Sequence, residues 1–301
     1  MNGNDLPLDR HLMLIVNPVS GRRQSTKVLP EVVRALMDGG YQVTTFITAS
    51  RGDASRFAAQ YGAQFDRIVS VGGDGTFSET VAGVVSAGLH VPVGMIPAGS
   101  TNDFSACHGI PSDPVEAARA LVAGAPRPLD VGMLDGHSFC YIAAFGAFSW
   151  LSYTTPQPLK NALGHSAYIL DGIKELPRIH AEHLRITTEQ RCIEGNFIFG
   201  AVCNTSSVAG TFSLPKEEVC TSDGLFEILL VYEPVTLLEL QAEINALRTQ
   251  NYESPLVEFF RAPGLTVETD GAMEWSLDGE RADGGRLVQI ENLRRRLTLI
   301  C

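Results

Sequence analysis

The sequence predicts an α/β domain followed by a β-rich domain, and two observations indicate this order. Over roughly the first 125 residues, short apolar runs alternate with segments whose apolar residues recur at helical spacing. This rhythm is typical of a parallel sheet covered by helices. After residues 126–128, strand-like runs follow one another, joined by Gly, Asp and Pro, as in a β-sandwich. We therefore expect one domain over 1–128 and a second over 129–292, and the strand at about 293–301 is a candidate to return to the first.

The elements of the first domain follow in alternation. We expect strands at 11–16, 41–48, 67–71 and 91–96, and helices at 30–37, 53–61, 77–87 and 114–122. The helix at 114–122 has the clearest start, because Asp113 suits the N-cap, Pro114 suits the first turn and Glu116 completes a capping box.

The sequence predicts that the second domain consists almost entirely of strands. They are expected at 138–147, 183–188, 196–204, 226–232, 265–269, 274–280, 286–291 and 296–300. Two helical segments interrupt them, at 167–175 and 237–250, and the second opens with a Thr236/Glu239 capping box.

Composition limits the function classes. The 301 residues include 45% hydrophobic and 19% charged residues, a balance typical of a globular protein with a sizeable core. With 23 basic and 34 acidic residues, the net charge of −11 argues against broad binding to nucleic acid. An anionic ligand would therefore have to be held locally, by loops and helix ends.

Cysteine spacing and hydropathy indicate the compartment. The six cysteines show no CxxC or CxxH spacing, which disfavours a zinc site and a disulfide framework. No apolar run approaches the ~20 residues of a membrane-spanning helix, and the run near the N-terminus is too short for a signal peptide. We expect a cytoplasmic protein that meets lipid, if at all, only at the membrane surface.

Small residues gather where three of the predicted parallel strands end. These loops are NPVSG at 17–21, GGDGT at 72–76 and PAGSTND at 97–103. Ligands of open parallel sheets bind outside the carboxyl ends of the strands, where glycine N–H groups and helix N-termini can hold phosphate. Each loop alone also fits a plain turn, and the sequence contains neither GxGxxG nor GxxxxGK[ST]. Together the three loops predict a triphosphate site.

Two acids near the C-terminus suit proton transfer. Asp278 and Glu280 lie two apart in the predicted strand 274–280, so both would project to one face, roughly 6.6 Å apart. A carboxylate near an attacking hydroxyl suits phosphoryl transfer. Alternatively, Asp278-Gly279 forms a type I′ turn, but Asp283-Gly284-Gly285 is the better turn and leaves Asp278 within a strand. Asp223-Gly224 by itself predicts a turn, and Asp103 suits a helix N-cap.

Several motifs together resemble a known family. VNPVSG at 16–21, SVGGDGTFSETVAGV at 70–84 and IPAGSTNDF at 96–104 are similar to the diacylglycerol kinase catalytic-domain family, in particular its soluble bacterial lipid kinases, whose relatives include sphingoid-base kinases. CNTSSVAG at 203–210, SDGLFEILL at 222–230 and LDGE at 277–280 follow in the expected order. GGDGT alone is shared with NAD kinases and phosphofructokinases, whereas the ordered set is specific.

The resemblance implies an α/β domain that binds ATP and a β-sandwich domain that supplies the lipid end and the base, with ATP between them. The implied ATP contacts are Asn17, Pro18, Val19, Ser20, Gly21, Thr48, Gly72, Gly73, Asp74, Gly75, Thr76, Phe77, Ser78, Glu79, Ser100, Asn102 and Asp103. The family usually has threonine where Ser100 stands, so the hydroxyl is kept.

The resemblance also implies a metal and a base. A structural Mg²⁺ site falls on Cys220, Asp223 and Leu225, with the first and last acting through backbone carbonyls. Ser222 stands where some relatives have an acid. The base motif falls on Asp278 and Glu280, and Asp278 is the preferred base.

We therefore expect an ATP- and Mg²⁺-dependent lipid kinase, most simply one that converts diacylglycerol to phosphatidic acid at the inner membrane face, with a homodimer as a family-level expectation. Alternatives are a kinase for a sphingoid base, another glycerolipid or NAD, and a non-catalytic, nucleotide-gated lipid-binding protein. An NAD kinase would carry an NE-type loop after GGDGT, which this sequence lacks.

Two further clusters have two interpretations each. Phe148, Trp150, Leu151 and Tyr153 suit either a lipid groove or ordinary core. The basic run at 294–296 suits either anionic headgroups or a solvated strand end.

Overall fold

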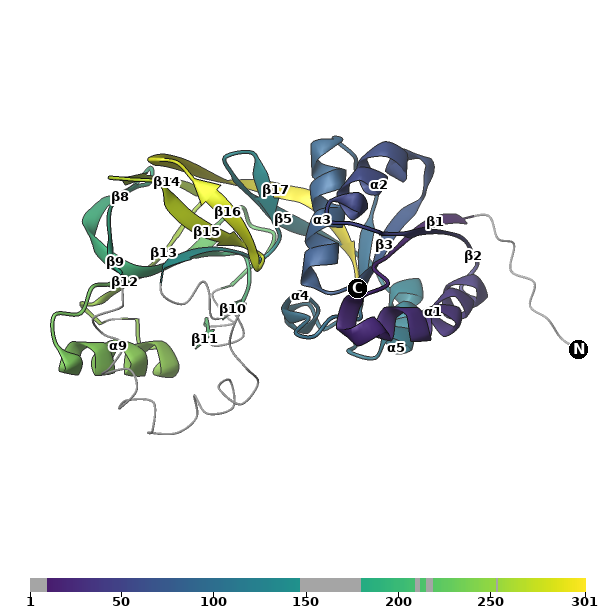
Figure 1. Cartoon of the computed structure of the whole chain (residues 1–301), viewed down its shortest axis with the longest axis horizontal. Helices are drawn as coiled ribbons and strands as arrows, with labels where there is room; N and C mark the ends of the chain where they lie inside the picture. The colour runs from purple at the N-terminus through teal and green to yellow at the C-terminus, as the bar shows by residue number, and fades with distance from the viewer. Residues whose placement is uncertain (1–9, 147–179, 209–211, 215–218, 253) are drawn as a thin grey trace, which may run out of the picture. The chain divides into compact units, whose positions relative to one another are not determined.

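The computed structural model describes residues 10–146, 180–208, 212–214, 219–252 and 254–301 (Figure 1). The chain forms two compact units: Met1–Val131 with Arg294–Cys301, and Gly132–Leu293. The helix expected at 167–175 and the aromatic cluster expected at 148–153 lie outside the described residues.

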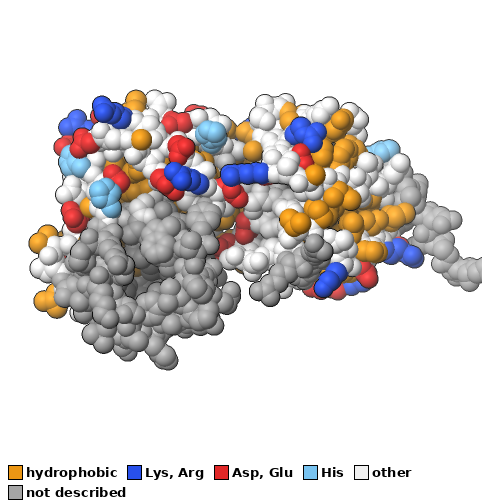
Figure 2. Space-filling view, in the orientation of Figure 1, with side chains coloured by type: hydrophobic (Ala, Val, Ile, Leu, Met, Phe, Trp, Pro, Cys, Tyr) orange, Lys and Arg blue, Asp and Glu red, His pale blue; other side chains and the backbone are white. Residues whose placement is uncertain are grey.

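Charged side chains of both signs are mixed on the surface. On the face seen in Figure 2, Lys and Arg side chains lie among Asp and Glu, and the described residues there form no continuous basic patch. Within the described part of the chain, no helix is both long and apolar enough to cross a membrane.

The first unit contains a parallel sheet in the order β2-β1-β3-β4-β17. Its strands are β1 (Arg10–Val16), β2 (Tyr41–Ile47), β3 (Arg67–Gly72), β4 (Val93–Pro97) and the end of β17 (Leu287–Ile300). Beyond their polar first residues, the central strands β1 and β3 are buried and mostly apolar, as expected for a sheet covered on both faces.

Helices cover both faces of this sheet (Figure 1). They are α1 (Ser20–Asp38), α2 (Asp53–Tyr61), α3 (Asp74–Ser86), α4 (Asp103–Cys107) and α5 (Pro114–Ala123), with a 3₁₀ turn η1 (Gly62–Gln64). α1 and α5 lie on one face, and α2 and α3 lie on the other. The predicted N-cap of α5 is confirmed, because the Asp113 carboxylate accepts the Val115 and Glu116 N–H groups at 3.0 and 2.9 Å. The predicted capping box is wrong, because the Glu116 side chain pairs with Arg119 instead.

Two helix starts differ from the prediction. α1 begins at Ser20, directly after the first loop, and Pro30 lies inside it. Because proline favours the first turn of a helix, Pro30 led to a predicted helix start that is too late in the sequence. α3 begins at Asp74 instead of Phe77, because the GGDGT loop itself forms the first turn. The short α4 was not predicted.

The second unit is strand-rich, and the predicted fold class is confirmed. Its strands, with part of β17, are β5 (Pro126–Leu134), β6 (His137–Phe139), β7 (Ile142–Gly146), β8 (Glu182–Thr187), β9 (Cys192–Cys203), β10 (Ser207–Val208), β11 (Phe212–Ser213), β12 (Phe226–Tyr232), β13 (Val257–Ala262), β14 (Gly264–Thr269), β15 (Met273–Leu277) and β16 (Glu280–Gly284). Helix α9 (Leu237–Thr249) has the predicted Thr236/Glu239 capping box.

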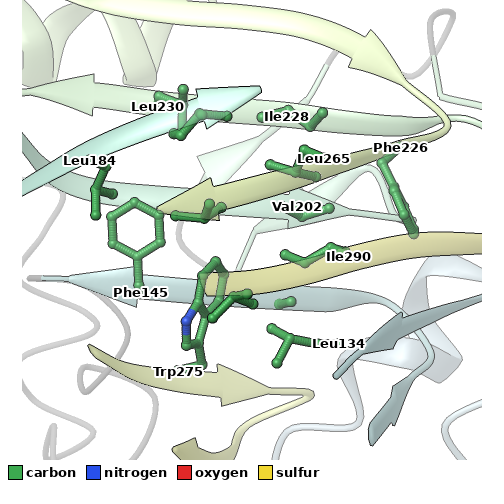
Figure 3. Packing of buried hydrophobic residues seen from close by; sticks show 14 of the residues in the cluster. Leu134, Phe145, Leu184, Val202, Phe226, Ile228, Leu230, Leu265, Trp275 and Ile290 are labelled. Atoms are coloured by element: carbon green, nitrogen blue, oxygen red, sulfur yellow. The ribbon is translucent and has the colours of Figure 1, made fainter. Parts of the chain in front are cut away.

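One apolar core holds these strands together (Figure 3). Phe145 of β7 and Trp275 of β15 meet edge to face, with ring centroids 5.1 Å apart. Both side chains are almost fully buried, and such aromatic pairs stabilise a core beyond the area they bury.

The strand predicted at 274–280 is wrong, because it is a hairpin. β15 and β16 pair antiparallel, with Leu277 opposite Glu280. Asp278 and Gly279 form the turn, with φ of 49° and 86°, and two positive φ values are the mark of a type I′ turn, which matches the twist of the paired strands. Asp278 therefore lies in the turn and Glu280 begins the next strand, so the two acids do not share one strand face.

Two strands continue from one unit to the other. β5 crosses the division near Val131, and β17 crosses it near Arg294. The first part of β17 pairs antiparallel with β14, and Leu299 near its end pairs parallel with Val93 of β4. The C-terminal residues thus complete the sheet of the first unit.

Candidate functional site

The three loops of small residues lie at the carboxyl edge of the parallel sheet. Hydrogen bonds tie the first and third loops to β3 between them: Asn17 N–H donates to Val71 O at 3.0 Å, and Ala98 N–H donates to Gly72 O at 2.7 Å. The sheet thus brings together the ends of β1, β3 and β4, as the strand order requires.

The first loop is tied to the second by side chains. Asn17 Nδ2 donates to Thr76 Oγ1 at 3.1 Å, and Asn17 Oδ1 accepts the Val19 N–H at 3.2 Å. The buried Ser25 donates to Asn17 O at 2.6 Å. Pro18, Ser20 and Gly21 complete the passage into α1, and the side chain of Val19 is 70% exposed.

The second and third loops touch through glycine. A Cβ atom built on Gly99 would lie 2.5 Å from the Cα of Gly73, closer than real Cβ contacts. Glycine at 99 is therefore required by this backbone approach. Because Gly73 immediately precedes α3, the close approach sets the third loop beside the positive end of this helix.

Asp74 holds the third loop in place. Its carboxylate accepts the Asp103 and Phe104 N–H groups, both at 3.1 Å, and so caps α4 from another loop. Burial raises the pKa of Asp74, and the N–H bonds oppose the shift. Asn102, with φ of 56°, bonds Gly99 N–H and O through its side chain at 3.0 and 3.1 Å. Asp103 is the first residue of α4 and Asn102 is the N-cap, so of the two interpretations of Asp103, N-cap or functional acid, the N-cap is wrong.

Two other predicted contacts take part in packing. Phe77 is 1% exposed, and its ring lies 4.3 Å from that of Phe104. Glu79 Oε1 accepts the Gly52 N–H at 2.9 Å. Ser100, in contrast, is exposed, and Gly75 and Ser78 are half-buried.

Thr48 stands at the end of the edge strand β2. Its N–H donates to Val16 O at 2.9 Å. The Asp53 carboxylate orders the following turn by accepting the Ala49 and Ser50 N–H groups at 2.8 and 2.9 Å. The hydrogen bond from Arg56 is the main reason that the pKa of Asp53 lies well below its usual range.

In the second unit, Asp278 is surrounded by backbone donors. Its side chain is buried, and its carboxylate accepts the N–H groups of Cys140, Tyr141 and Ile142 at 2.6, 2.9 and 3.1 Å. Charge-assisted bonds of this kind are strong and fix the carboxylate. Glu280, two residues on, is exposed at the start of β16.

A residue that the sequence analysis did not single out holds the same loop from the other side. Asn204 is fully buried, its Nδ2 donates to Cys140 O at 3.2 Å, and its N–H donates to Tyr141 O at 2.9 Å. The CNTSSVAG motif contains it, but only the fold shows that it contacts the loop bound by Asp278.

The predicted metal loop at 220–225 contains a different arrangement. Asp223 Oδ1 accepts the Leu225 N–H at 3.0 Å, and Asp223 Oδ2 is paired with the guanidinium of Arg261. Cys220 is exposed, with its Sγ 3.8 Å from Ser222 Oγ.

Arg261 also binds a buried acid. Its Nε donates to Glu227 Oε1 at 3.1 Å, across the β12–β13 pair. Burial raises the pKa of Glu227 to about 7, and Arg261 opposes this shift. Glu227 and Arg261 were both missed by the sequence analysis, although an acid in the otherwise apolar strand 226–232 was a signal.

The side chain of Asp223, which the resemblance makes a Mg²⁺ ligand, is already bound by two donors. Mg²⁺ requires several oxygen ligands in near-octahedral geometry. Both oxygens of Asp223 are engaged by donors, one of them cationic. Over the described ranges, no group of three or more His, Cys, Asp or Glu residues is placed to hold a metal ion.

Comparisons with known proteins agree with the sequence motifs. A family model described as the diacylglycerol kinase catalytic domain matches residues 11–134. A diacylglycerol kinase of Bacillus subtilis (strain 168) is 32% identical over 290 residues, covering 95% of this chain and 95% of the relative. One of Staphylococcus haemolyticus (strain JCSC1435) is 31% identical, covering 94% and 86%.

Solved structures share the fold. A protein of Bacillus anthracis str. Sterne, described as a proposed diacylglycerol kinase, superposes with a TM-score of 0.81 at 25% identity, over 100% of this chain and 98% of its own. A diacylglycerol kinase structure from the same organism gives 0.75 at 22% identity, over 97% and 96%.

Proposed function

Because this chain belongs to the diacylglycerol kinase family and is a lipid kinase, we propose that it transfers the γ-phosphoryl group of ATP to the free hydroxyl of diacylglycerol, giving phosphatidic acid and ADP. The observation that carries the proposal is the edge of the first unit, where three loops of small residues meet beside the N-terminus of α3.

The nucleotide end of the reaction belongs to the first unit. In a chain of net charge −11, the triphosphate needs local positive potential, which backbone N–H groups and a helix N-terminus provide. Gly73, Gly75 and the exposed Ser100 offer these groups without bulky side chains. Mg²⁺ that arrives with ATP would neutralise charge on the phosphates.

We assign the residues that act on the lipid hydroxyl to the second unit. In the proposed step the lipid hydroxyl oxygen bonds to the γ-phosphorus, the bond from that phosphorus to the β–γ bridging oxygen breaks, and the hydroxyl proton passes to a carboxylate. Asp278 is the preferred acceptor of this proton and Glu280 its partner. Three backbone donors hold Asp278 still, and positioning contributes more than base strength in such loose transition states.

A phosphoryl-transfer assay tests the proposal. We would follow label from the γ-phosphate of ATP into a lipid panel in mixed micelles, with and without Mg²⁺, for the wild type, Asp278→Asn and Glu280→Gln. Asp283→Asn is the matched control, because it makes the same change at an exposed position of the same hairpin.

Labelled phosphatidic acid that requires Asp278 and survives the Asp283 change is the expected result. If a different lipid is labelled, that lipid and not diacylglycerol is the acceptor. Label only in a parallel NAD reaction would overturn the lipid proposal. Full turnover by a folded Asp278→Asn enzyme, with loss in Glu280→Gln, would move the base to Glu280.

A further inference from the structure

A triad of charged residues, one of them fully buried, lies where the family resemblance places a structural metal. Arg261 of β13 contacts Asp223 in the 220–225 loop and Glu227 in β12. Glu227 is fully buried, whereas Asp223 and Arg261 are 30% and 31% exposed. The guanidinium therefore joins a surface loop to an acid in the sheet.

The geometry of arginine suits this task. Its planar fork presents donors in fixed directions and stays charged at any physiological pH. Here the Nη2 group donates a hydrogen bond to Asp223, and the Nε group donates one to Glu227. Glu227 and Arg261 are direct cross-strand partners in the β12–β13 ladder, so the sheet fixes the position of the cation.

A divalent ion and this guanidinium would compete for the same oxygen. Oδ2 of Asp223 is paired with Arg261, and Oδ1 accepts the Leu225 N–H. A Mg²⁺ ion on Asp223 would sit beside a positive charge, and repulsion at such a distance is strong wherever water is partly excluded. Ser222, half-buried beside Asp223, adds a hydroxyl but no negative charge.

We propose that in this chain Arg261 takes the place of the structural Mg²⁺ ion: its guanidinium fastens the 220–225 loop to β12, and the loop binds no divalent cation. The inference concerns only this loop and is independent of the lipid acceptor. The kinase then needs only the Mg²⁺ that accompanies ATP.

The wild-type protein gives the first test, without nucleotide, so that MgATP plays no part. We would measure Tm and titration heats with MgCl₂ and CaCl₂ against NaCl of equal ionic strength. The expected result is no divalent-specific rise in Tm and no saturable binding heat. A saturable rise that Asp223→Asn abolishes would overturn the proposal, whatever the activity of the enzyme.

Variants test the fastening itself. Arg261→Met keeps length but leaves Glu227 buried without its cation, so we expect Tm to fall by roughly 5–10 °C, with partial recovery in Arg261→Lys. Arg185→Met is the control, because Arg185 pairs with Glu194 at 2.7 Å on an exposed surface of the same unit, where such pairs contribute little.

The outcomes separate cleanly. A large loss in Arg261→Met beside an unchanged Arg185→Met supports the proposal. An unchanged Tm in Arg261→Met would overturn it. If Arg261→Met does not fold, the wild-type titration still decides whether the loop takes a divalent ion.

Discussion

Three acids in the family motifs bind backbone N–H groups of loops, Asp74 and Asp278 in a neighbouring loop and Asp223 in its own. Asp74 accepts two N–H groups, Asp278 accepts three, and Asp223 accepts one in addition to its ion pair. A carboxylate accepts such bonds on two charged oxygens, whereas a neutral amide has a single acceptor oxygen and carries donors in place of the other. These side chains therefore help to shape the loops of the proposed site.

Asp74→Asn should raise the KM for ATP by roughly tenfold, because one of two charge-assisted bonds to α4 is lost and the third loop shifts. Initial rates against ATP at saturating lipid measure this. Asp66→Asn is the control: Asp66 also accepts a backbone N–H, from His11 at 2.7 Å, but at the other end of the strands. Equal KM values in all three proteins would contradict a positioning role.

His108 should make the first unit sensitive to mild acid. Its ring packs on Phe104 at 4.3 Å, and burial, with a smaller contribution from Arg127, lowers its pKa to about 4. In the unfolded chain the histidine pKa is near 6.5. Between about pH 4 and pH 6.5 the unfolded chain therefore binds more protons than the folded chain does. The free energy of unfolding should therefore fall as pH drops from about 6.5 to about 4, by at most about 3 kcal/mol from this group.

Urea unfolding at a series of pH values, wild type against His108→Phe, isolates this contribution. The wild type should lose more stability over this range than the variant does. His137→Phe, at the exposed first position of β6, is the control and should follow the wild type. Parallel pH profiles for the wild type and His108→Phe would refute the assignment.

At the scale of elements, the pair of loops at 72–76 and 97–103 depends on the absence of side chains. The approach of Gly99 to Gly73 is too close for any Cβ, because such an atom would lie 2.5 Å from the backbone Cα of Gly73 and 2.7 Å from Asn102 Oδ1. Unlike a flexible side chain, backbone cannot move aside without shifting α3 or α4.

Gly99→Ala should therefore lower both ATP affinity and stability, the latter by about 1–3 kcal/mol. A nucleotide titration and a denaturation curve measure the two effects. Gly271→Ala is the matched control, because its added Cβ meets nothing within 4 Å. Wild-type affinity in Gly99→Ala would show that the two loops can separate without loss.

Local signals in the sequence were sufficient for most elements. Helix α2 and the capped starts of α5 and α9 were predicted because the responsible residues are neighbours in the chain. α4 was missed because five residues are too few to show a period. The turn at Asp278-Gly279 was rejected because a second glycine turn lay close by, and only the pairing register decides between them.

The loops of the site were predictable, but their internal bonds were not. The bonds of Asp74 to α4, of Arg261 to Asp223 and of Asp278 to Tyr141 span 29, 38 and 137 residues. Periodicity and spacing give the face of a strand or helix, and they do not give the direction of a side chain in a loop. Roles inside the loops therefore required the fold.

At the scale of the whole molecule, we propose that the first unit binds the nucleotide and the second unit supplies the groups that act on the lipid. Bound nucleotide should therefore stabilise segments of the first unit. A ligand that binds only the folded form protects the segments that it holds.

Hydrogen exchange with ADP should show slower exchange at 17–21, 72–76 and 97–103. The β12–β13 pair in the second unit serves as the internal reference. Protection confined to the second unit would contradict the nucleotide assignment. Loss of the effect in Gly99→Ala would link it to the loop pair.

The path of β17 has a consequence for biosynthesis. Arg294–Cys301 belong to the first unit, yet a ribosome translates them after the whole of the second. A nascent chain that has just emerged up to Val131 has four strands of its parallel sheet and lacks the strand that pairs with β4. Domains commonly fold in the order of their synthesis; here the unit that is made first must be finished last.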